Sequence, residues 1–401
     1  MSYVEIIENS EQRLKQLAEQ GAAIIGYIYP HVPLELFLAH GLTPSLILTN
    51  PSTRGGFESS LQTFSCSLTR NIFSQRMNGV LSLDGIVFPG NTCDALQNVS
   101  DVWRKRFPDD KVFRLTYPAR IPSESAVRFF AEELKILSET LEKTFGHEMS
   151  DDALLNAISL TNEFRDIIQF FYACRLINPE SISYSDLMGF IRAFLTTPTS
   201  DILDDIKTRY ETVDSLMKEN GSHASAVSLK DALLKRNLED YSLPSTGPGS
   251  RLLVVGGMIE PQAITDMLNE IGEVDESIIV LDLLSFGFKT MFSPPISIDG
   301  DRYIALAKSI LGAPLEPTQE GLPERVKFLK SLLTKLSING LIVCEQSFCD
   351  PDEFEAPSLV KAARDVGVPS VRLPMDPELS DRARLEVKIQ TFVETLENGG
   401  A

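Results

Sequence analysis

Short apolar runs alternate with helix-like stretches over the first 120 residues. Runs rich in β-branched and aromatic residues occupy 22–30, 45–50, 83–90 and 112–118. The stretch 33–41 between them has the composition of a helix, with Pro33 in its first turn, and another helix is expected from Asp94. A charged amphipathic stretch up to about residue 19 predicts one more helix at the start. Strand and helix in alternation predict an α/β unit with a mainly parallel sheet.

Residues 122–240 follow another pattern, because their apolar residues recur at three- and four-residue steps without a strand signal. A segment rich in Pro, Gly and Ser then follows at 238–251 and predicts a long loop. The α/β pattern returns after it, with strands expected at 251–257, 277–284, 339–347 and 369–376, and helices at 263–271, 358–367 and 382–398. The predicted fold class is α/β, with two Rossmann-like α/β units that have parallel sheets and are joined by a helical segment.

The predicted domains follow from these pattern changes. They are an N-terminal helix with the first α/β domain (1–121), the helical segment (122–245) and the second α/β domain (246–401).

Composition narrows the function classes. The chain has 401 residues and a formal net charge of −19, which opposes non-specific binding to nucleic acid or to an anionic membrane surface. Its apolar runs are too short to span a membrane, and its N-terminus lacks the pattern of a signal peptide. We therefore expect a cytoplasmic protein. Five cysteines are an odd and sparse set, which favours reduced thiols over a disulfide framework.

Three cysteines stand at or near the ends of predicted strands. Cys93 follows the strand 83–90, Cys349 follows the strand 339–347, and Cys66 lies in a loop where a helix begins. In parallel sheets, ligands bind beyond the carboxyl ends of the strands, so these thiols can meet in one cleft. Thiolates suit zinc, copper(I) or iron–sulfur clusters. The alternative is a set of scattered buried cysteines, which is how free cysteine commonly occurs.

The other candidates give weaker signals. Cys174 lies within a predicted helix and Cys344 within a predicted strand, so both are expected to be structural, although Cys344 stands five residues before Cys349. His31, in a loop after the first predicted strand, is either solvated or a proton donor. The segment 254–261 lacks a complete phosphate-binding motif and predicts a tight turn.

Six segments together resemble the benzoyl-CoA reductase and 2-hydroxyacyl-CoA dehydratase family. They are YIYPHVPLELFLAHGLTP, SCSLTR, LDGIVFPGNTCDALQNVSDVWR, RLLVVGGMIEP, NGLIVCEQSFCDPDEFEAP and VKIQTFVETLEN. The resemblance runs through nearly the whole chain in order, and the stretch 61–104 resembles most the C-type subunit of ATP-dependent benzoyl-CoA reductase.

The resemblance implies a 4Fe-4S cluster held by Cys66, Cys93 and Cys349 between two α/β domains. Ser65, Thr92, Asp94 and Asp350 are then candidates for contacts around the cluster, and His31 and Glu35, near the end of the first predicted strand, are candidates for supplying a proton.

The implied reaction is a low-potential, one-electron reduction of an acyl-CoA thioester, leading to ring reduction or to elimination of a 2-hydroxyl group. The implied partners are a homologous second subunit, an ATP-dependent activator iron–sulfur protein and the acyl-CoA substrate. The sequence departs from the family after the strand 277–284, where Cys and Arg are missing, and at Lys388, where relatives often carry arginine. The alternative is therefore an electron-transfer or cluster-carrier protein of the same fold without its own acyl-CoA site.

Overall fold

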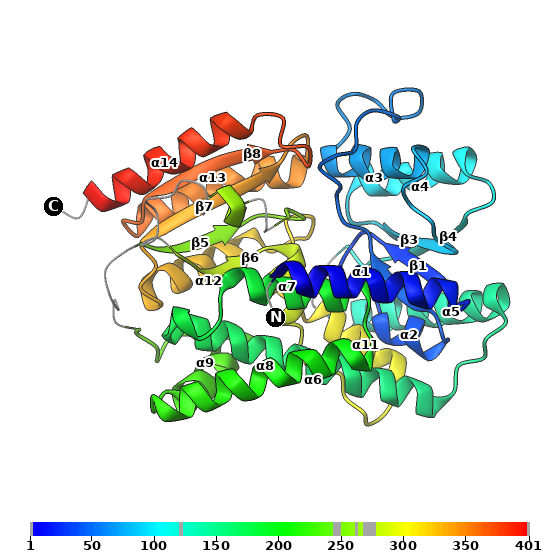
Figure 1. Ribbon diagram of the computed structural model, residues 1–401, viewed down its shortest axis with the longest axis horizontal. Helices are drawn as coiled ribbons and strands as arrows, with labels where there is room; N and C mark the ends of the chain where they lie inside the picture. The colour runs from blue at the N-terminus through cyan, green and yellow to red at the C-terminus, as the bar shows by residue number, and fades with distance from the viewer. Residues whose placement is uncertain (1–2, 120–122, 244–249, 261–263, 268–277, 399–401) are drawn as a thin grey trace.

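The computed structural model describes residues 3–119, 123–243, 250–260, 264–267 and 278–398 (Figure 1). In the first half of the chain, four parallel strands form a sheet in the order β2-β1-β3-β4. They are β1 (Ile24–Tyr27), β2 (Thr43–Leu46), β3 (Gly85–Gly90) and β4 (Lys111–Thr116). The first three strands are buried along their length, including the polar Thr43 and Ser45 of β2.

The second sheet repeats this topology in the last third of the chain. Its parallel strands have the order β6-β5-β7-β8, which is again second, first, third and fourth in sequence. They are β5 (Arg251–Val255), β6 (Ile278–Leu283), β7 (Gly340–Gln346) and β8 (Ser370–Met375). In such sheets the strand order reverses between the first and third strands, and the carboxyl ends at this switch point form a crevice. The protein therefore has two crevices of the same kind.

Helices cover the sheets and fill the middle of the chain. Those of the first half are α1 (Tyr3–Glu19), α2 (Leu34–Ala39), α3 (Ser67–Met77) and α4 (Asp94–Arg106). The middle segment holds α5 (Glu124–Phe145), α6 (Asp151–Ile177), the short turn η1 (Pro179–Ser181), α7 (Tyr184–Thr196), α8 (Ser200–Glu219) and α9 (His223–Leu234). The second half adds the turn η2 (Ser285–Lys289), α11 (Arg302–Leu311), α12 (Leu322–Lys335), α13 (Asp350–Asp365) and α14 (Arg382–Asn398).

The middle helices connect the two sheets. Helix α6 packs against α2 of the first unit and β6 of the second, and α5 packs against β4 and α11 (Figure 1). A single apolar core accordingly includes Val87 of β3, Phe171 of α6 and Val254 of β5. This shared core fixes one sheet relative to the other, and so fixes the distance between their two crevices.

The α/β fold class predicted from the sequence is confirmed. The predicted helix at 358–367 begins earlier than expected, because α13 starts at Asp350 with Pro351 in its first turn and continues through Pro357. The predicted helix at 263–271 lies largely outside the described residues, and the domain boundaries stay a prediction. In the described part of the chain, no helix is both long and apolar enough to cross a membrane.

Candidate functional site

Three cysteine side chains line one cavity of about 290 Å³ between the two sheets. Cys93 follows β3 and Cys349 follows β7, so each comes after the third strand of its sheet, beside the switch point. Cys66 ends the long loop before α3. The structure therefore brings these three residues together in one cavity, as predicted.

Each of these cysteines is also the N-cap residue of a helix. Cys66 precedes α3, Cys93 precedes α4 and Cys349 precedes α13. The Sγ atom of Cys93 accepts a hydrogen bond from the backbone N–H of Leu96 at 3.5 Å. Three helix N-termini thus face the cavity, and their partial positive charge favours thiolates or another anionic group there.

The thiols differ in acidity because they differ in their contacts. A hydrogen bond with Cys349 lowers the pKa of Cys66, whose own sulfur then carries the negative charge more readily, and the same contact raises the pKa of Cys349. Burial raises the pKa of Cys93 to about 12. Cys66 is therefore the thiol of this set that ionises most readily.

Two backbone loops meet directly at the cavity. The N–H of Ser67 donates to the carbonyl of Ser347 at 3.0 Å, and the side-chain amide of Gln346 donates to the hydroxyl of Ser67. These bonds join the segment after Cys66 to the segment before Cys349, although they lie far apart in sequence. The relative position of these two cysteines is thus set by hydrogen bonds as well as by the core.

Three hydroxyl groups in the cavity lining are buried without a hydrogen-bond partner. They belong to Tyr29, Thr92 and Thr318. The hydroxyls of Tyr29 and Thr318 interact electrostatically but do not reach hydrogen-bond geometry. A buried polar group without a partner is costly, at about 1–3 kcal/mol. Their gathering at one cavity indicates that the cavity takes a group that accepts hydrogen bonds.

The charged residues of the lining are acidic. They are Asp94, Glu316, Asp350 and Asp352, and no lysine or arginine belongs to the described lining. Burial raises the pKa of Asp352 to about 7. Gly257, after β5, lies against this carboxyl group, since a Cβ built there would stand 2.5 Å from Oδ1 of Asp352. Glycine is therefore required for the close approach of the β5 turn to α13.

Three thiols from separate segments form a donor set that a cluster could use. Among the described residues, no three His, Cys, Asp or Glu side chains come close enough together to hold one ion. A four-iron cluster takes each cysteine on a different iron, so its ligands stand farther apart than those of one ion. The donor set of three thiols, the three helix N-termini and the unpartnered hydroxyls all fit such a group.

The other residues predicted from the sequence are placed differently. Thr92, Asp94 and Asp350 line the cavity, whereas Ser65 is next to Cys66 but outside the lining. His31 is buried, and its Nε2 lies 2.8 Å from Oε1 of Glu316, behind the cavity.

Glu35 is buried elsewhere, on α2. Its Oε1 accepts from Thr161 at 2.6 Å and from Arg165 at 2.9 Å, both on α6. This structural ion pair keeps Glu35 away from the thiols. The proton-supplying roles of Glu35 and His31 stay predictions.

The remaining cysteines are packed in the core, as their sequence positions predicted. Cys174 lies in α6 and Cys344 in β7, and both side chains are buried. Burial raises the pKa of Cys174 to about 12 and that of Cys344 further still. Neither belongs to the described lining of the thiol cavity.

A buried ion-pair network behind the thiols could not be read from sequence spacing. Oε2 of Glu316 accepts from Nζ of Lys289 at 3.0 Å and from the hydroxyl of Ser285 at 2.8 Å, while Oε1 faces His31. Lys289 also donates to the carbonyl of Gly256 at 2.9 Å. The only available sequence signal is the unusual presence of a lysine in the apolar segment after β6.

The fold and the cavity define a class of protein: two α/β units of equal topology with a thiol-lined site between their switch points. Comparison with known families narrows this class. Residues 30–396 match the family described as 2-hydroxyglutaryl-CoA dehydratase, D-component, and the chain belongs to that family.

Individual relatives are similar over nearly their whole length. The chain is 23% identical to the (R)-phenyllactyl-CoA dehydratase beta subunit of Clostridium sporogenes, over 98% of this chain and 97% of that one. It is 24% identical to the lactoyl-CoA dehydratase beta subunit of Anaerotignum propionicum, over 94% and 93%. It is 25% identical to the C-type subunit of benzoyl-CoA reductase from Thauera aromatica, over 88% and 86%. The resemblance inferred from the sequence is confirmed, and the chain is an enzyme subunit of the lyase or oxidoreductase type.

Proposed function

We propose that this chain is the cluster-carrying subunit of an acyl-CoA dehydratase or reductase, with a 4Fe-4S cluster held by Cys66, Cys93 and Cys349. The observation that carries the proposal is the meeting of three thiols, from three separate segments, in one cavity. Thiolate ligands are typical of iron–sulfur clusters. When bound, such a cluster supplies low-potential one-electron chemistry, here toward elimination of a 2-hydroxyl group or reduction of an aromatic ring in an acyl-CoA thioester.

The chain's own residues position and shield the cluster. The N-termini of α3, α4 and α13 offset its negative charge. The hydroxyls of Tyr29, Thr92 and Thr318 line the cavity and would be available as hydrogen-bond donors to such a group, and hydrogen bonds to its sulfurs would raise its reduction potential. Asp94 and Asp350 are exposed beside the cavity, where their negative charge opposes the arrival of an electron and so lowers that potential.

A second assignment keeps the cluster but moves the substrate to another subunit. The described lining of the thiol cavity carries four acidic residues and no cation, although coenzyme A is a polyanion. Phosphate groups are normally bound by arginine, lysine or helix N-termini. On this assignment the chain transfers electrons, and a homologous second subunit binds the acyl-CoA. Binding of an acyl-CoA to the anaerobically isolated chain would favour the first assignment, and binding only to the complex would favour the second.

The proposed partner covers the cavity mouth. Phe348 lines the cavity and is 51% exposed, and Phe354, in the first turns of the helix α13 that begins there, is 80% exposed. Exposed aromatic side chains are typical of interface cores. The relatives are named as beta or C-type subunits, which favours a homologous subunit as the occupant. An ATP-dependent activator iron–sulfur protein is the proposed electron donor.

Five alanine variants test the cluster. Each of Cys66→Ala, Cys93→Ala and Cys349→Ala removes one thiolate, and iron and acid-labile sulfide in the anaerobically purified protein should fall to background. Cys174→Ala and Cys344→Ala are matched controls that alter buried cysteines outside the cavity and should retain about four irons per chain. A full complement of iron in Cys93→Ala, or a wild-type protein that binds one zinc and no sulfide, would contradict the proposal.

A further inference from the structure

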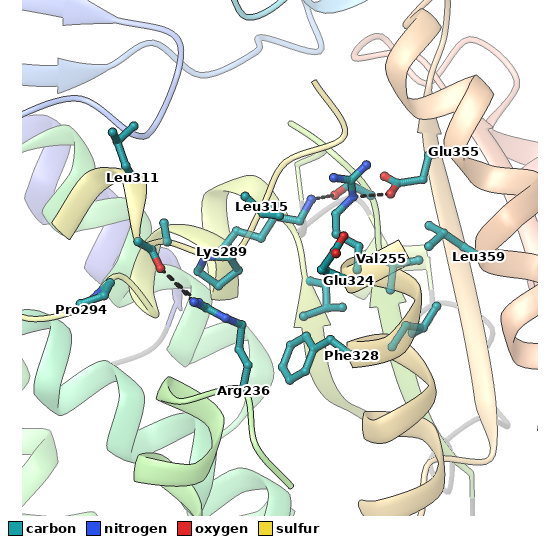
Figure 2. A pocket seen from close by; sticks show the side chains of 17 residues that line it. Arg236, Val255, Lys289, Pro294, Leu311, Leu315, Glu324, Phe328, Glu355 and Leu359 are labelled. Atoms are coloured by element: carbon teal, nitrogen blue, oxygen red, sulfur yellow. Dashed lines mark hydrogen bonds and ion pairs between the residues drawn. The ribbon is translucent and has the colours of Figure 1, made fainter. Parts of the chain in front are cut away.

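A second cavity, of about 390 Å³, lies beside the second sheet (Figure 2). It is bounded by the carboxyl ends of β5 and β6, the segment after α11, and one face of α12. Its lining is mostly apolar, with Val255, Leu283, Leu311, Leu315, Phe328 and Leu359. The volume holds about a dozen groups the size of water, at roughly 30 Å³ each, and is in the range of small-molecule sites.

This cavity is distinct from the thiol cavity. Gly256 lines the apolar cavity, whereas the next residue, Gly257, lines the thiol cavity. The ion pair of Lys289 with Glu316 forms part of the same wall, because Lys289 faces the apolar cavity and Glu316 the thiol cavity. No cysteine belongs to the described lining of the apolar cavity. A ligand here would not touch the thiols.

The charged groups of the apolar cavity leave one cation without an acidic partner. Nε of Arg325 bonds to Oε1 of Glu355 at 2.5 Å, and Lys289 is paired with Glu316. Glu324 stands in the first turn of α12, whose N-terminus offsets its charge.

Arg236 is the cation that remains. Its guanidinium donates only to the carbonyl of Gly312, at 3.2 Å from each terminal nitrogen, and among the described residues no carboxylate lies within ion-pair distance of it (Figure 2). The structure therefore offers one unneutralised cation next to an apolar volume.

The backbone at Arg236 is also strained. Its φ is 52°, in the left-handed region, just after the end of α9. Helices commonly end at such a position with glycine, because a side chain is disfavoured there. The chain carries an arginine instead, although glycine would relieve the strain. Backbone strain retained next to a cavity is typical of a functional position.

We propose that the apolar cavity binds a small monocarboxylate with an aliphatic or aromatic body, whose carboxylate pairs with Arg236. The apolar body packs against Leu315 and Phe328. This site goes beyond the proposed function, since it requires neither the cluster nor coenzyme A. A free acid carries this carboxylate, whereas the thioester of the same acid has no negative charge at that end, so the site selects the free acid over its thioester.

The test uses octanoate as the probe. Phe328→Trp places an indole in the cavity wall, and the native Trp103 is fully buried in the first unit, so octanoate binding should change the emission of the introduced indole. In this background, Arg236→Gly should weaken octanoate binding about tenfold while the thermal midpoint holds or rises, because the left-handed strain is relieved. Arg104→Gln alters an exposed arginine on α4 and is the matched control; it should leave the binding unchanged.

Three further ligands complete the test with the same full-length protein. Octan-1-ol and octylamine have the same chain with a neutral or a cationic head, and both should bind at least tenfold more weakly than octanoate. Octanoyl-CoA should not compete. The proposal is overturned if octanoate leaves the emission unchanged, if Arg236→Gly binds octanoate as the parent does, if the alcohol or the amine binds equally well, or if the thioester binds and the free acid does not.

Discussion

Glu316 is a buried, charged residue whose replacement should destabilise the fold strongly. Its side chain is 2% exposed and receives hydrogen bonds from Lys289, Ser285 and His31. Glu316→Gln preserves the shape but removes the charge, which leaves the Lys289 ammonium buried without the carboxylate that it pairs with. Loss of one member of a buried ion pair costs about 3–5 kcal/mol. We expect the free energy of unfolding to fall by that amount near neutral pH.

The pH dependence of stability provides an independent estimate of how much the ionised Glu316 contributes to the free energy of unfolding. Burial raises the pKa of Glu316, but Lys289 and His31 lower it by more, from 4.5 to about 2. A shift of about 2.5 units corresponds to about 3 kcal/mol. Because the folded-state pKa is depressed, this stability is present above pH 4.5 and is lost as the pH falls toward 2. The difference in stability between wild type and Glu316→Gln should therefore be largest near neutral pH and shrink on acidification.

Guanidinium unfolding of four proteins measures the interaction free energy between Glu316 and Lys289. They are the wild type, Glu316→Gln, Lys289→Met and the double variant, each followed by circular dichroism at pH 7 and pH 4. Lys289→Met in the Glu316→Gln background removes the unpaired cation, so the double variant should be more stable than the sum of the single effects predicts, by about 1–3 kcal/mol. Strictly additive effects, or a Glu316→Gln variant as stable as wild type at pH 7, would refute the reasoning.

Three other substitutions test separate parts of the structure. Gly257→Ala places a Cβ 2.5 Å from Oδ1 of Asp352, so we expect a loss of about 1–3 kcal/mol and lower iron retention; unchanged thermal unfolding would show that the turn can move. Asp110→Ala removes the partner of Arg76 and of the Trp103 indole N–H, and should lower the free energy of unfolding by about 2 kcal/mol, whereas Asp109→Ala in the same turn should change it little. Cys174→Ala, in the core of α6, should cost about 1 kcal/mol in guanidinium unfolding and leave the iron content intact, and loss of iron with the fold retained would contradict its structural role.

The strands and the convergence of thiols were predictable for a physical reason. Buried parallel strands have continuous apolar sequences, and the carboxyl ends of parallel strands lie on one edge of a sheet. A cysteine just after β3 or β7 must therefore lie at the carboxyl-terminal edge of its sheet. That the two edges face each other follows from the packing of α5 and α6 against both units, which no local pattern encodes.

The ion pairs could not be predicted in the same way. Glu316 pairs with His31 across 285 residues of chain, and the pairing depends on how two units dock. Glu35 shows that closeness in sequence to a strand end does not place a side chain at the cavity. It follows the first strand, yet helix α2 directs its carboxylate to Arg165 of α6. The apolar cavity could not be predicted either, because its lining comes from β5, β6, α12, α13, Arg236 after α9 and the segment from Lys289 to Leu315, none of which has a binding motif.

The three cysteines of the cavity are synthesised at very different times because they lie far apart along the chain. Cys66 and Cys93 leave the ribosome long before Cys349, and 256 residues separate positions 93 and 349. At roughly 5–20 residues per second, the interval is about 13–50 s. Throughout that time the first sheet can fold with two thiols and two helix N-termini facing solvent and no opposite wall. On the proposed cluster assignment, a cluster donor that acts before translation ends would meet two of the three ligands, and the third would arrive only with the second sheet.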